Sequence, residues 1–445
     1  MLIVDFDRFL MGYSLGVHII LASIGIALPV IILIAEYLGI RNNDVHYRAL
    51  AKRLAIVFVV LFAIGTASGT LVALEILLLW PKFMALVSQV SILPFYIETF
   101  AFFMESIFLA IYFYSWDRFK NRFAHLLTGI PIAIGSALSG VLITMINAWM
   151  NTPNGFNIPA YLANGTVTGV QPLAVFNTPS TAIEVSHVLA SSYFSGILVF
   201  AMYLAFMLLV CKDEQKKLYY RKGLGLVIVL AMVSTIAAVA TGLVSISSLV
   251  SLQPEKYAAI EGNINSTAFA PERIGGIPIG NNSGLAYFIP IPGAQSMLAT
   301  GSLNGTVPGL SSYPHSTWPP LIIHLFFDIM VGVGFAIAGL MALIVLLYLL
   351  RRNPIGNRII LWLVVAAGVL GLVILELGWV LAELGRQPWI IYNVMLVSDA
   401  ANYSASVIPA TALILVFYIA VIPATLLILR RIFRDRPLEN ELVNQ

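Results

Sequence analysis

The sequence predicts an all-α integral membrane protein with nine transmembrane helices, the N-terminus outside, the C-terminus inside and a long outer loop between helices six and seven. Three observations lead to this fold class. Of the 445 residues, 60% are hydrophobic and only 10% are charged, with a mean hydropathy of +0.93, whereas soluble globular proteins carry about 25% charged residues. Nine apolar segments are long enough to cross a membrane, and most basic residues lie on one side of them.

Each apolar segment provides the roughly 20 helical residues that cross a hydrocarbon core of about 30 Å. The expected spans are 9–37, 54–80, 93–116, 124–150, 182–211, 219–251, 321–350, 358–383 and 405–430. The first ten residues, MLIVDFDRFL, contain no basic region, and the apolar run after them is too long for a signal peptide. We therefore expect this segment to be retained as the first helix.

Basic residues predict the orientation of the helices, since cytoplasmic loops carry an excess of Lys and Arg. On one side lie 19 of the 24 Lys and Arg residues. They are Arg41, Arg48, Lys52, Arg53, Arg118, Lys120, Arg122, Lys212, Lys216, Lys217, Arg221, Lys222, Arg351, Arg352, Arg358, Arg430, Arg431, Arg434 and Arg436. The other side has only Arg8, Lys82, Lys256, Arg273 and Arg386. The C-terminus is therefore expected inside and the N-terminus outside.

Two of the expected outer loops are long. Residues 151–181 carry no charge, and residues 252–320 are rich in Gly, Pro, Asn and Ser. Loops of this length are usually functional or disordered. Because the second loop is apolar between its turns, as in GLAYFIPIPGAQSML, we expect it to be ordered and packed on the outer face. The whole chain, 1–445, is expected to be one transmembrane domain that includes this loop.

Several ionisable residues fall inside the expected helices, where they are costly and mark functional sites by default. Glu98 and Glu105 are seven residues apart, so they share one helix face at a spacing of about 10 Å along the axis. For Glu36 and His125, near the inner boundary, pairing at a helix end is an equally good explanation.

His18, His187, Met330 and Glu383 are all expected in the outer half of the membrane, at a similar depth. His, Met and carboxylate side chains suit heme iron better than zinc or an iron–sulfur cluster, because the chain has a single cysteine. A His/Met pair is the ligation that raises the potential of an electron-transfer heme. A single Met in a helix is more often part of the core than a ligand, so spacing leaves Met330 open.

Eight short motifs follow one another along the helices and the outer loop. They are GVHIILASIGIALP, ETFAFFMES, NAWMNTPNGF, EVSHVLASSYFSG, EKYAAIEG, LATGSLNGTVPGL, DIMVGVG and GWVLAELGRQPW. In this order on nine helices, the chain resembles subunit I of the cytochrome bd family of quinol oxidases over essentially its whole length. GRQPW with the preceding glutamate is nearly diagnostic of that family by itself.

The resemblance implies three hemes and their ligands. His187 and Met330 match the axial ligands of a low-spin heme b. His18 and Glu383 match ligands of two close high-spin hemes, a heme b and a heme d, with a third b-type heme as the alternative to heme d. Glu98 lies close enough to these hemes to be counted among the metal ligands.

The resemblance also assigns residues around the hemes. Glu98 and Glu105 match an acidic pair through which protons reach the oxygen site, while Arg386 and Trp379 match residues beside the propionates and the electron path. A supporting role in the heme pocket or the proton path is expected for Glu75, Ser139, Asn147 and Arg8. Lys256 and Glu261, at the start of the outer loop, match a quinol-binding pair, and this loop is the short form of the family's Q-loop. We expect the pair to be exposed to water.

The activity implied is that of a quinol:oxygen oxidoreductase in a prokaryotic plasma (cytoplasmic) membrane. Quinol would be oxidised at the outer face, and oxygen reduced to water with protons from the inside, which makes the reaction electrogenic. The expected partners are a second multi-pass subunit (subunit II or a paralogue), with a small single-helix subunit as a further candidate, together with membrane lipid. No nucleic acid is expected.

One position departs from the family pattern. The family usually has an arginine two residues before the ligand methionine, where this chain has Asp328. His324 lies four residues earlier on the same helix face and is a candidate partner. A negative charge here would lower the potential of the low-spin heme unless it is paired or protonated. Two other functions stay open: a divergent oxidase with b-type hemes and another donor, and a proton- or ion-coupled transporter that uses its buried carboxylates as relays.

Overall fold

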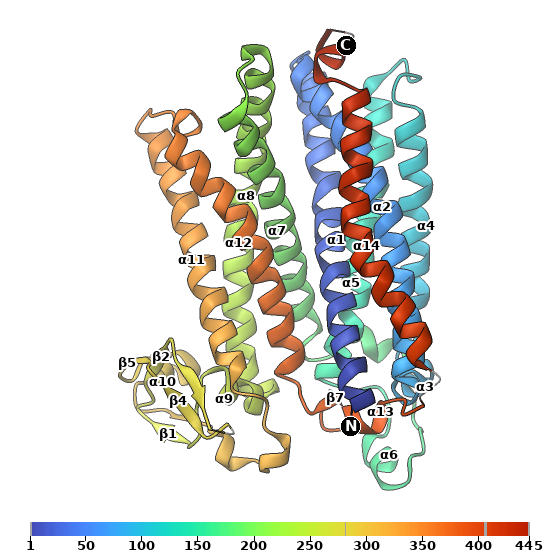
Figure 1. Ribbon diagram of the computed structural model, residues 1–445. Helices are drawn as coiled ribbons and strands as arrows, with labels where there is room; N and C mark the ends of the chain where they lie inside the picture. Colours follow the sequence, from blue (N-terminus) through green and yellow to red (C-terminus); the bar gives the residue numbers. More distant parts are fainter. Residues whose placement is uncertain (1, 281, 405–406, 444–445) are drawn as a thin grey trace.

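The computed structural model describes residues 2–280, 282–404 and 407–443. Within these ranges, nine helices are long and apolar enough to cross a membrane, which confirms the predicted all-α fold with nine transmembrane helices. They are α1 (Leu2–Arg41), α2 (Val45–Leu79), α4 (Leu93–Tyr114), α5 (Arg122–Asn151), α7 (Thr181–Val210), α8 (Glu214–Leu252), α11 (Ile322–Leu349), α12 (Arg358–Leu384) and α14 (Ile408–Asp435). The helices stand side by side, and the two termini lie at opposite ends of the bundle (Figure 1).

The helices agree with the predicted spans except at their polar ends. Two clear extensions are at α2, which begins at Val45 rather than at residue 54, and at α8, which begins at Glu214 rather than at residue 219. Side chains cap both starts: Asp44 accepts a hydrogen bond from the backbone of His46 (2.9 Å), and Asp213 accepts one from that of Gln215 (2.9 Å). A capped polar turn continues a helix beyond the apolar part that hydropathy detects. Residues 405–406 of the last predicted span lie outside the described residues.

The bundle has two halves, which α1, α7 and α12 join. In Figure 1, α8 and α11 lie on one side with α12 and α7, while α2, α4, α5 and α14 surround α1 on the other. Helix α7 packs against α1, α8 and α12. The main apolar core includes residues 27–35 of α1, 194–205 of α7 and 337–344 of α11. It occupies the half of the bundle nearer the C-terminus, so the candidate site residues lie on the other half of the same helices.

The described residues between α8 and α11, 253–280 and 282–321, are ordered, as the sequence predicts. Its elements are α9 (Pro254–Ile260), α10 (Ala294–Thr300), and the strands β1 (Thr267–Ala268), β2 (Glu272–Ile274), β3 (Ile277–Ile279), β4 (Gly284–Ala286), β5 (Ile289–Ile291) and β6 (Thr306–Val307). The strands form three antiparallel pairs, β1 with β6, β2 with β5 and β3 with β4. They pack under the ends of α8 and α11 (Figure 1).

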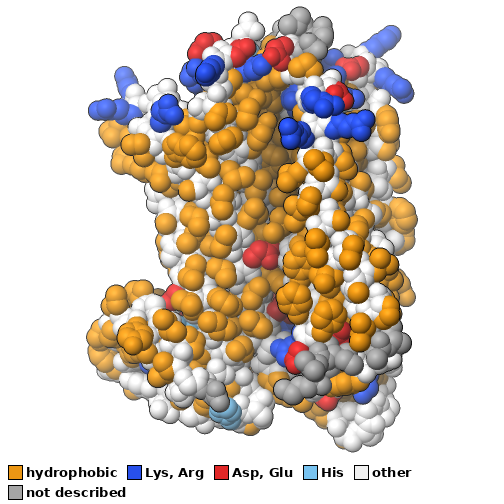
Figure 2. Space-filling view, viewed as in Figure 1, with side chains coloured by type: hydrophobic (Ala, Val, Ile, Leu, Met, Phe, Trp, Pro, Cys, Tyr) orange, Lys and Arg blue, Asp and Glu red, His pale blue; other side chains and the backbone are white. Residues whose placement is uncertain are grey.

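Shorter elements complete the chain. They are α3 (Pro81–Val90), α6 (Ile158–Asn164), α13 (Val397–Ala400), α15 (Leu438–Val443), the antiparallel pair β7 (Trp389–Ile391) and β8 (Met395–Leu396), and the 3₁₀ helices Pro172–Asn177, Leu310–Ser312, His315–Thr317 and Pro354–Gly356. Figure 2 shows Lys and Arg side chains gathered mainly at the end that carries the C-terminus, with hydrophobic side chains along the bundle. This distribution agrees with the uneven placement of basic residues in the sequence.

Candidate functional site

His18 of α1 is held by a hydroxyl group of α2. Its Nδ1 lies 2.9 Å from Ser68 Oγ, and Ser68 Oγ donates its own hydrogen to Gly65 O at 2.9 Å. Because that hydroxyl has one hydrogen, both contacts are hydrogen bonds only when Nδ1 donates to Ser68, and Nε2 of the neutral ring then keeps a free lone pair. A Cβ at Gly69 would lie only 3.0 Å from the ring, so the glycine makes room for the imidazole. The tautomer with a free lone pair on Nε2 is the one that a metal-binding histidine needs.

His187 of α7 is held in the same way by α8. Its Nδ1 lies 3.1 Å from Thr241 Oγ1, which donates to Ala237 O at 2.8 Å. Nε2 is again left with a free lone pair. A Cβ at Gly242 would lie 3.2 Å from the ring. Both candidate heme ligands thus face a hydroxyl residue that is followed by glycine on the neighbouring helix.

Met330 is partly buried on α11, against α12. A Cβ at Gly378 of α12 would lie 2.9 Å from its Sδ, so only glycine leaves room for the thioether in this position. Trp379, the next residue of α12, is half-buried and lies four residues before Glu383. The helices of His187 and Met330 both pack against α8 and α12.

Glu98 and Glu105 both face α5, as their spacing predicts. Glu98 Oε1 accepts a hydrogen bond from Ser139 at 2.6 Å. Glu105 is 6% exposed, and a Cβ at Gly135 of α5 would lie 2.9 Å from its Cβ. A glycine on α5 therefore allows this carboxylate to pack between the two helices.

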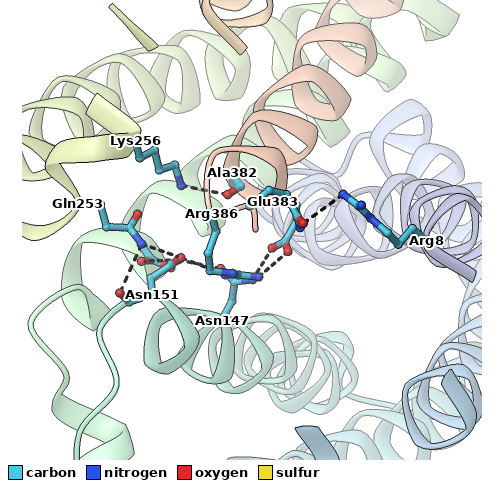
Figure 3. A network of polar contacts seen from close by, with 10 residues as sticks. Arg8, Asn147, Asn151, Gln253, Lys256, Ala382, Glu383 and Arg386 are labelled. Atoms are coloured by element: carbon cyan, nitrogen blue, oxygen red, sulfur yellow. Dashed lines mark hydrogen bonds and ion pairs between the residues drawn. The ribbon is translucent and has the colours of Figure 1, made fainter. Parts of the chain in front are cut away.

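The polar network around Glu383 and Arg386 joins the C-terminal end of α12 to α5 (Figure 3). Glu383 accepts a hydrogen bond from Asn147 at 2.7 Å and forms an ion pair with Arg386 at 2.5 Å. Arg386, which is 3% exposed, also donates to Asn151 Oδ1 at 2.9 Å. Beside it, Arg8 donates to Gln387 at 3.1 Å. Arg386 is thus the counter-ion of Glu383.

Glu184, a carboxylate inside an expected helix, joins this network together with Asn151 and Gln253, which were not recognised in the sequence as site residues. Asn151 donates to Glu184 at 2.9 Å and to Asn147 at 3.2 Å, and it accepts a hydrogen bond from Gln253 at 3.1 Å. Lys256 donates to the carbonyl oxygen of Ala382 at 3.0 Å. The spacing in NAWMN, which puts Asn147 and Asn151 on one helix face, was the available signal.

Lys256 and Glu261 are both 5% exposed, so the expectation that they are exposed to water was wrong. All residues from 255 to 263 are buried, because α9 packs against α8 and α11 and is covered by the loop. Burial lowers the pKa of Lys256 to about 8, with the carboxylate of Glu184 acting in the opposite direction. Burial, and next the negative charge of Glu272, raises the pKa of Glu261 well above its usual value.

Asp328 and His324 form the expected pair, 3.5 Å apart, and both contact the outer loop. Asp328 accepts a hydrogen bond from the backbone of Gly275 at 2.5 Å. The two ring nitrogens of His324 lie 2.6 Å from Ile260 O and 2.9 Å from Gly275 O. The His324 ring and the Asp328 carboxylate thus both contact backbone groups of the loop. The departure from the family pattern thus ties the loop to α11.

The donor set fits a heme. Among the described residues, no three His, Cys, Asp or Glu side chains gather as a site for a bare metal ion, whereas heme iron needs only one or two protein ligands. Buried polar atoms without a partner in the described chain include Oε2 of Glu75, Oε1 of Glu376 and Nε of Arg386. Such atoms cost roughly 1–3 kcal/mol each unless another molecule satisfies them.

Comparison with known proteins identifies the family of this chain. The family model for cytochrome bd terminal oxidase subunit I matches residues 6–437. A putative cytochrome bd menaquinol oxidase subunit I of Bacillus subtilis (strain 168) is 36% identical over 440 residues, covering 98% of this chain and 97% of that protein. Subunit 1 of the cytochrome bd-II ubiquinol oxidase of Escherichia coli (strain K12) is 24% identical over 461 residues, covering 88% of each protein.

A solved structure is similar as well. The bd oxidase from Geobacillus thermodenitrificans matches with a TM-score of 0.89 and 40% sequence identity, over 98% of this chain and 99% of that one. The resemblance seen in the sequence is thereby confirmed, and with it the terminal oxidase activity and the use of heme. The chain belongs to the cytochrome bd terminal oxidase subunit I family and is a multi-pass protein of the prokaryotic plasma membrane.

Proposed function

We propose that this chain is the catalytic subunit of a quinol:oxygen oxidoreductase, which oxidises quinol beside α9 and reduces oxygen to water. The observation that carries the proposal is the polar network that runs from Gln253, beside α9, through Asn151 and Arg386 to Glu383. It joins the proposed donor site to the proposed oxygen site within the protein. The relative at 36% identity is named a menaquinol oxidase, so menaquinol is the first donor to test.

His187 and Met330 are the proposed ligands of a low-spin heme b. His18, Glu383 and Glu98 are the proposed ligands of two high-spin hemes, a heme b and a heme d, or a third b-type heme in its place. The free Nε2 of each histidine supports this assignment. When bound, the hemes supply the electron transfer and the oxygen chemistry, while the protein supplies position and protons.

Lys256 and Glu261 are the proposed quinol-binding pair, and 252–320 the quinol-binding loop within a single domain, 1–445. Their burial supports this role, because a quinol ring binds in a site from which water is largely excluded. Glu105 and Glu98, aligned along α4, are proposed to pass protons from the inner side to the oxygen site. Arg386 and Trp379 would lie beside the heme edges.

We place the end with the C-terminus in the cytoplasm, because most Lys and Arg residues gather there (Figure 2). Protons for oxygen reduction then come from the inside, and those of quinol are released outside. The proposed partners are a second multi-pass subunit and, as a further candidate, a small single-helix subunit. Large apolar side chains exposed on α4 and α14, such as Phe100 and Leu413, suit contact with such subunits or with lipid.

The test is to purify the complex from membranes and to record a reduced-minus-oxidised optical spectrum and quinol-driven oxygen uptake. The spectrum should show heme bands. Oxygen uptake should occur only when quinol is added, with a sample without quinol as the control. A colourless protein would favour the transporter, and coloured protein without quinol-driven uptake would favour another donor. Pigment extraction then separates heme d from a third b-type heme.

A further inference from the structure

A small cavity with several polar lining residues lies between the outer ends of α7 and α8. Its polar lining residues are Thr152, Ser180, Glu184, Ser245, Ser248 and Gln253. Its volume is about 20 Å³, and a space of this size holds about one water molecule when it has polar partners. Hydroxyl groups and a carboxylate provide such partners here.

Glu184 lies where this cavity meets the polar network. It belongs to the first turn of α7, three residues before His187, and accepts a hydrogen bond from Asn151 at 2.9 Å. The cations that act on its carboxylate are Lys256 of α9 and Arg386 after α12. Glu184 is therefore in electrostatic reach of the proposed donor site on one side and lines the cavity on the other.

The charge of Lys256 depends on this carboxylate. Burial lowers the pKa of the Lys256 amine to about 8, and the negative charge of Glu184 is the largest influence that raises it again, ahead of that of Glu383. Arg386, already paired with Glu383, lowers it. An amine that titrates near neutral pH beside a carboxylate is suited to exchanging a proton with it.

We propose that Glu184 receives the protons released by quinol oxidation and passes them through the cavity to the outer face. This inference rests on the proposed function, in which quinol binds beside Lys256. Each quinol loses two O–H protons and two electrons and becomes quinone, and the electrons go to the oxygen-reducing heme chain. Each proton converts the Glu184 carboxylate to the neutral acid, by way of the Lys256 amine. The acid then loses the proton to water in the cavity, and both side chains return to their starting state.

The first test is Glu184→Gln in the complex in its membrane. The amide keeps the size and can still bond to Asn151, but it cannot carry a proton. Quinol-driven oxygen uptake should fall by about 10²-fold, at the lower end of what a positioned proton-transfer group contributes. The heme spectrum, and uptake driven by an artificial reductant that feeds the hemes directly, should be unchanged. The matched control is Glu214→Gln: Glu214 lies at the opposite end of α8 and pairs with Lys217 at 2.7 Å, so turnover should stay parental.

The second test closes the cavity. Ser248→Val removes a hydroxyl of the lining, whereas Ser247→Val changes its exposed neighbour on α8, outside the cavity. Only Ser248→Val should lose quinol turnover and the release of protons outside, followed with a pH dye in vesicles. Parental quinol turnover in Glu184→Gln would overturn the inference alone. A second result would also overturn the inference: loss of heme in Glu184→Gln combined with full turnover in Ser248→Val. It would show that the role of Glu184 is structural. A parental complex that oxidises no quinol would remove the proposed function and this inference together.

Discussion

At the scale of residues, the two candidate histidine ligands share one device. Ser68 and Thr241 each give their hydroxyl hydrogen to a carbonyl group of their own helix and accept the Nδ1–H of the histidine on the next helix. The glycine that follows each of them lies against the imidazole ring. Orientation and tautomer are thus set by neighbouring helices, as outer-shell hydrogen bonds do in metal sites.

Thr241→Val tests this device at His187. Valine keeps the shape of threonine but cannot accept the Nδ1–H, and a buried N–H without a partner costs roughly 1–3 kcal/mol. The reduced low-spin band should shift or weaken, while the high-spin bands stay. Thr241→Ser, which keeps the hydroxyl, is the control. An unaltered low-spin spectrum in Thr241→Val would show that the hydroxyl does not position the ligand.

Replacing Glu105 and replacing Glu98 should have different effects, although both side chains face α5. Glu105→Gln should slow oxygen uptake by about 10²-fold, because it removes a proton-transfer group, and should leave heme content normal. Glu98→Gln, at a proposed ligand, should also change heme content or spectrum. Ser106→Ala, on the exposed face of α4, is the control. Full oxygen uptake in Glu105→Gln with normal heme would rule out the proton relay.

At the scale of elements, the packing of α9 explains why the start of the outer loop is buried. A seven-residue helix that starts at Pro254 would be water-exposed in an open loop, but here it is covered by α8, α11 and the loop itself. Asp328 and His324 together hold the Gly275 turn over the start of α11. The site for quinol is therefore built by an element and its cover together.

The burial of α9 predicts a pH dependence. Because burial lowers the pKa of Lys256 to about 8, the side chain is an ammonium below this pH and a proton-accepting amine above it. Quinol turnover should rise as the pH passes upward through about 8. Lys256→Arg stays charged over this range, so its turnover should be low and should lack the rise. The check is quinol-driven oxygen uptake across the pH range. The same inflection in both proteins would assign it to another group.

At the scale of the whole molecule, charge and packing are divided between the two ends of the bundle. The end with the C-terminus carries most Lys and Arg residues (Figure 2) and the main apolar core. There Arg53 and Glu441 of α15 form an ion pair at 3.3 Å, and Lys216 pairs with Glu439. The other end holds the candidate ligands, the polar network and the loop. One end is thus suited to stability and orientation, and the other to binding.

The only cysteine of the chain tests the orientation. Cys211 caps the end of α7 on the basic side and is partly exposed. A membrane-impermeant thiol reagent should label this subunit in inverted vesicles and not in intact spheroplasts, as read by mass spectrometry of the chain. Cys211→Ser should remove the label. Labelling from outside only would reverse the proposed topology.

The sequence by itself determined the membrane fold, the order of the spans and the family, because these depend on local apolar length, charge and motifs. It also identified the side chains that match heme ligands, although their roles remain proposals. The tertiary structure decided the burial of Lys256 and Glu261, the network of Asn151, Glu184 and Gln253, and the tautomers of the two histidines. The reason is that hydropathy sums over neighbours in the chain, whereas burial and hydrogen bonding depend on helices far apart in sequence. Asn151 and Arg386, for instance, are 235 residues apart in the sequence, yet Arg386 Nη1 lies 2.9 Å from Asn151 Oδ1.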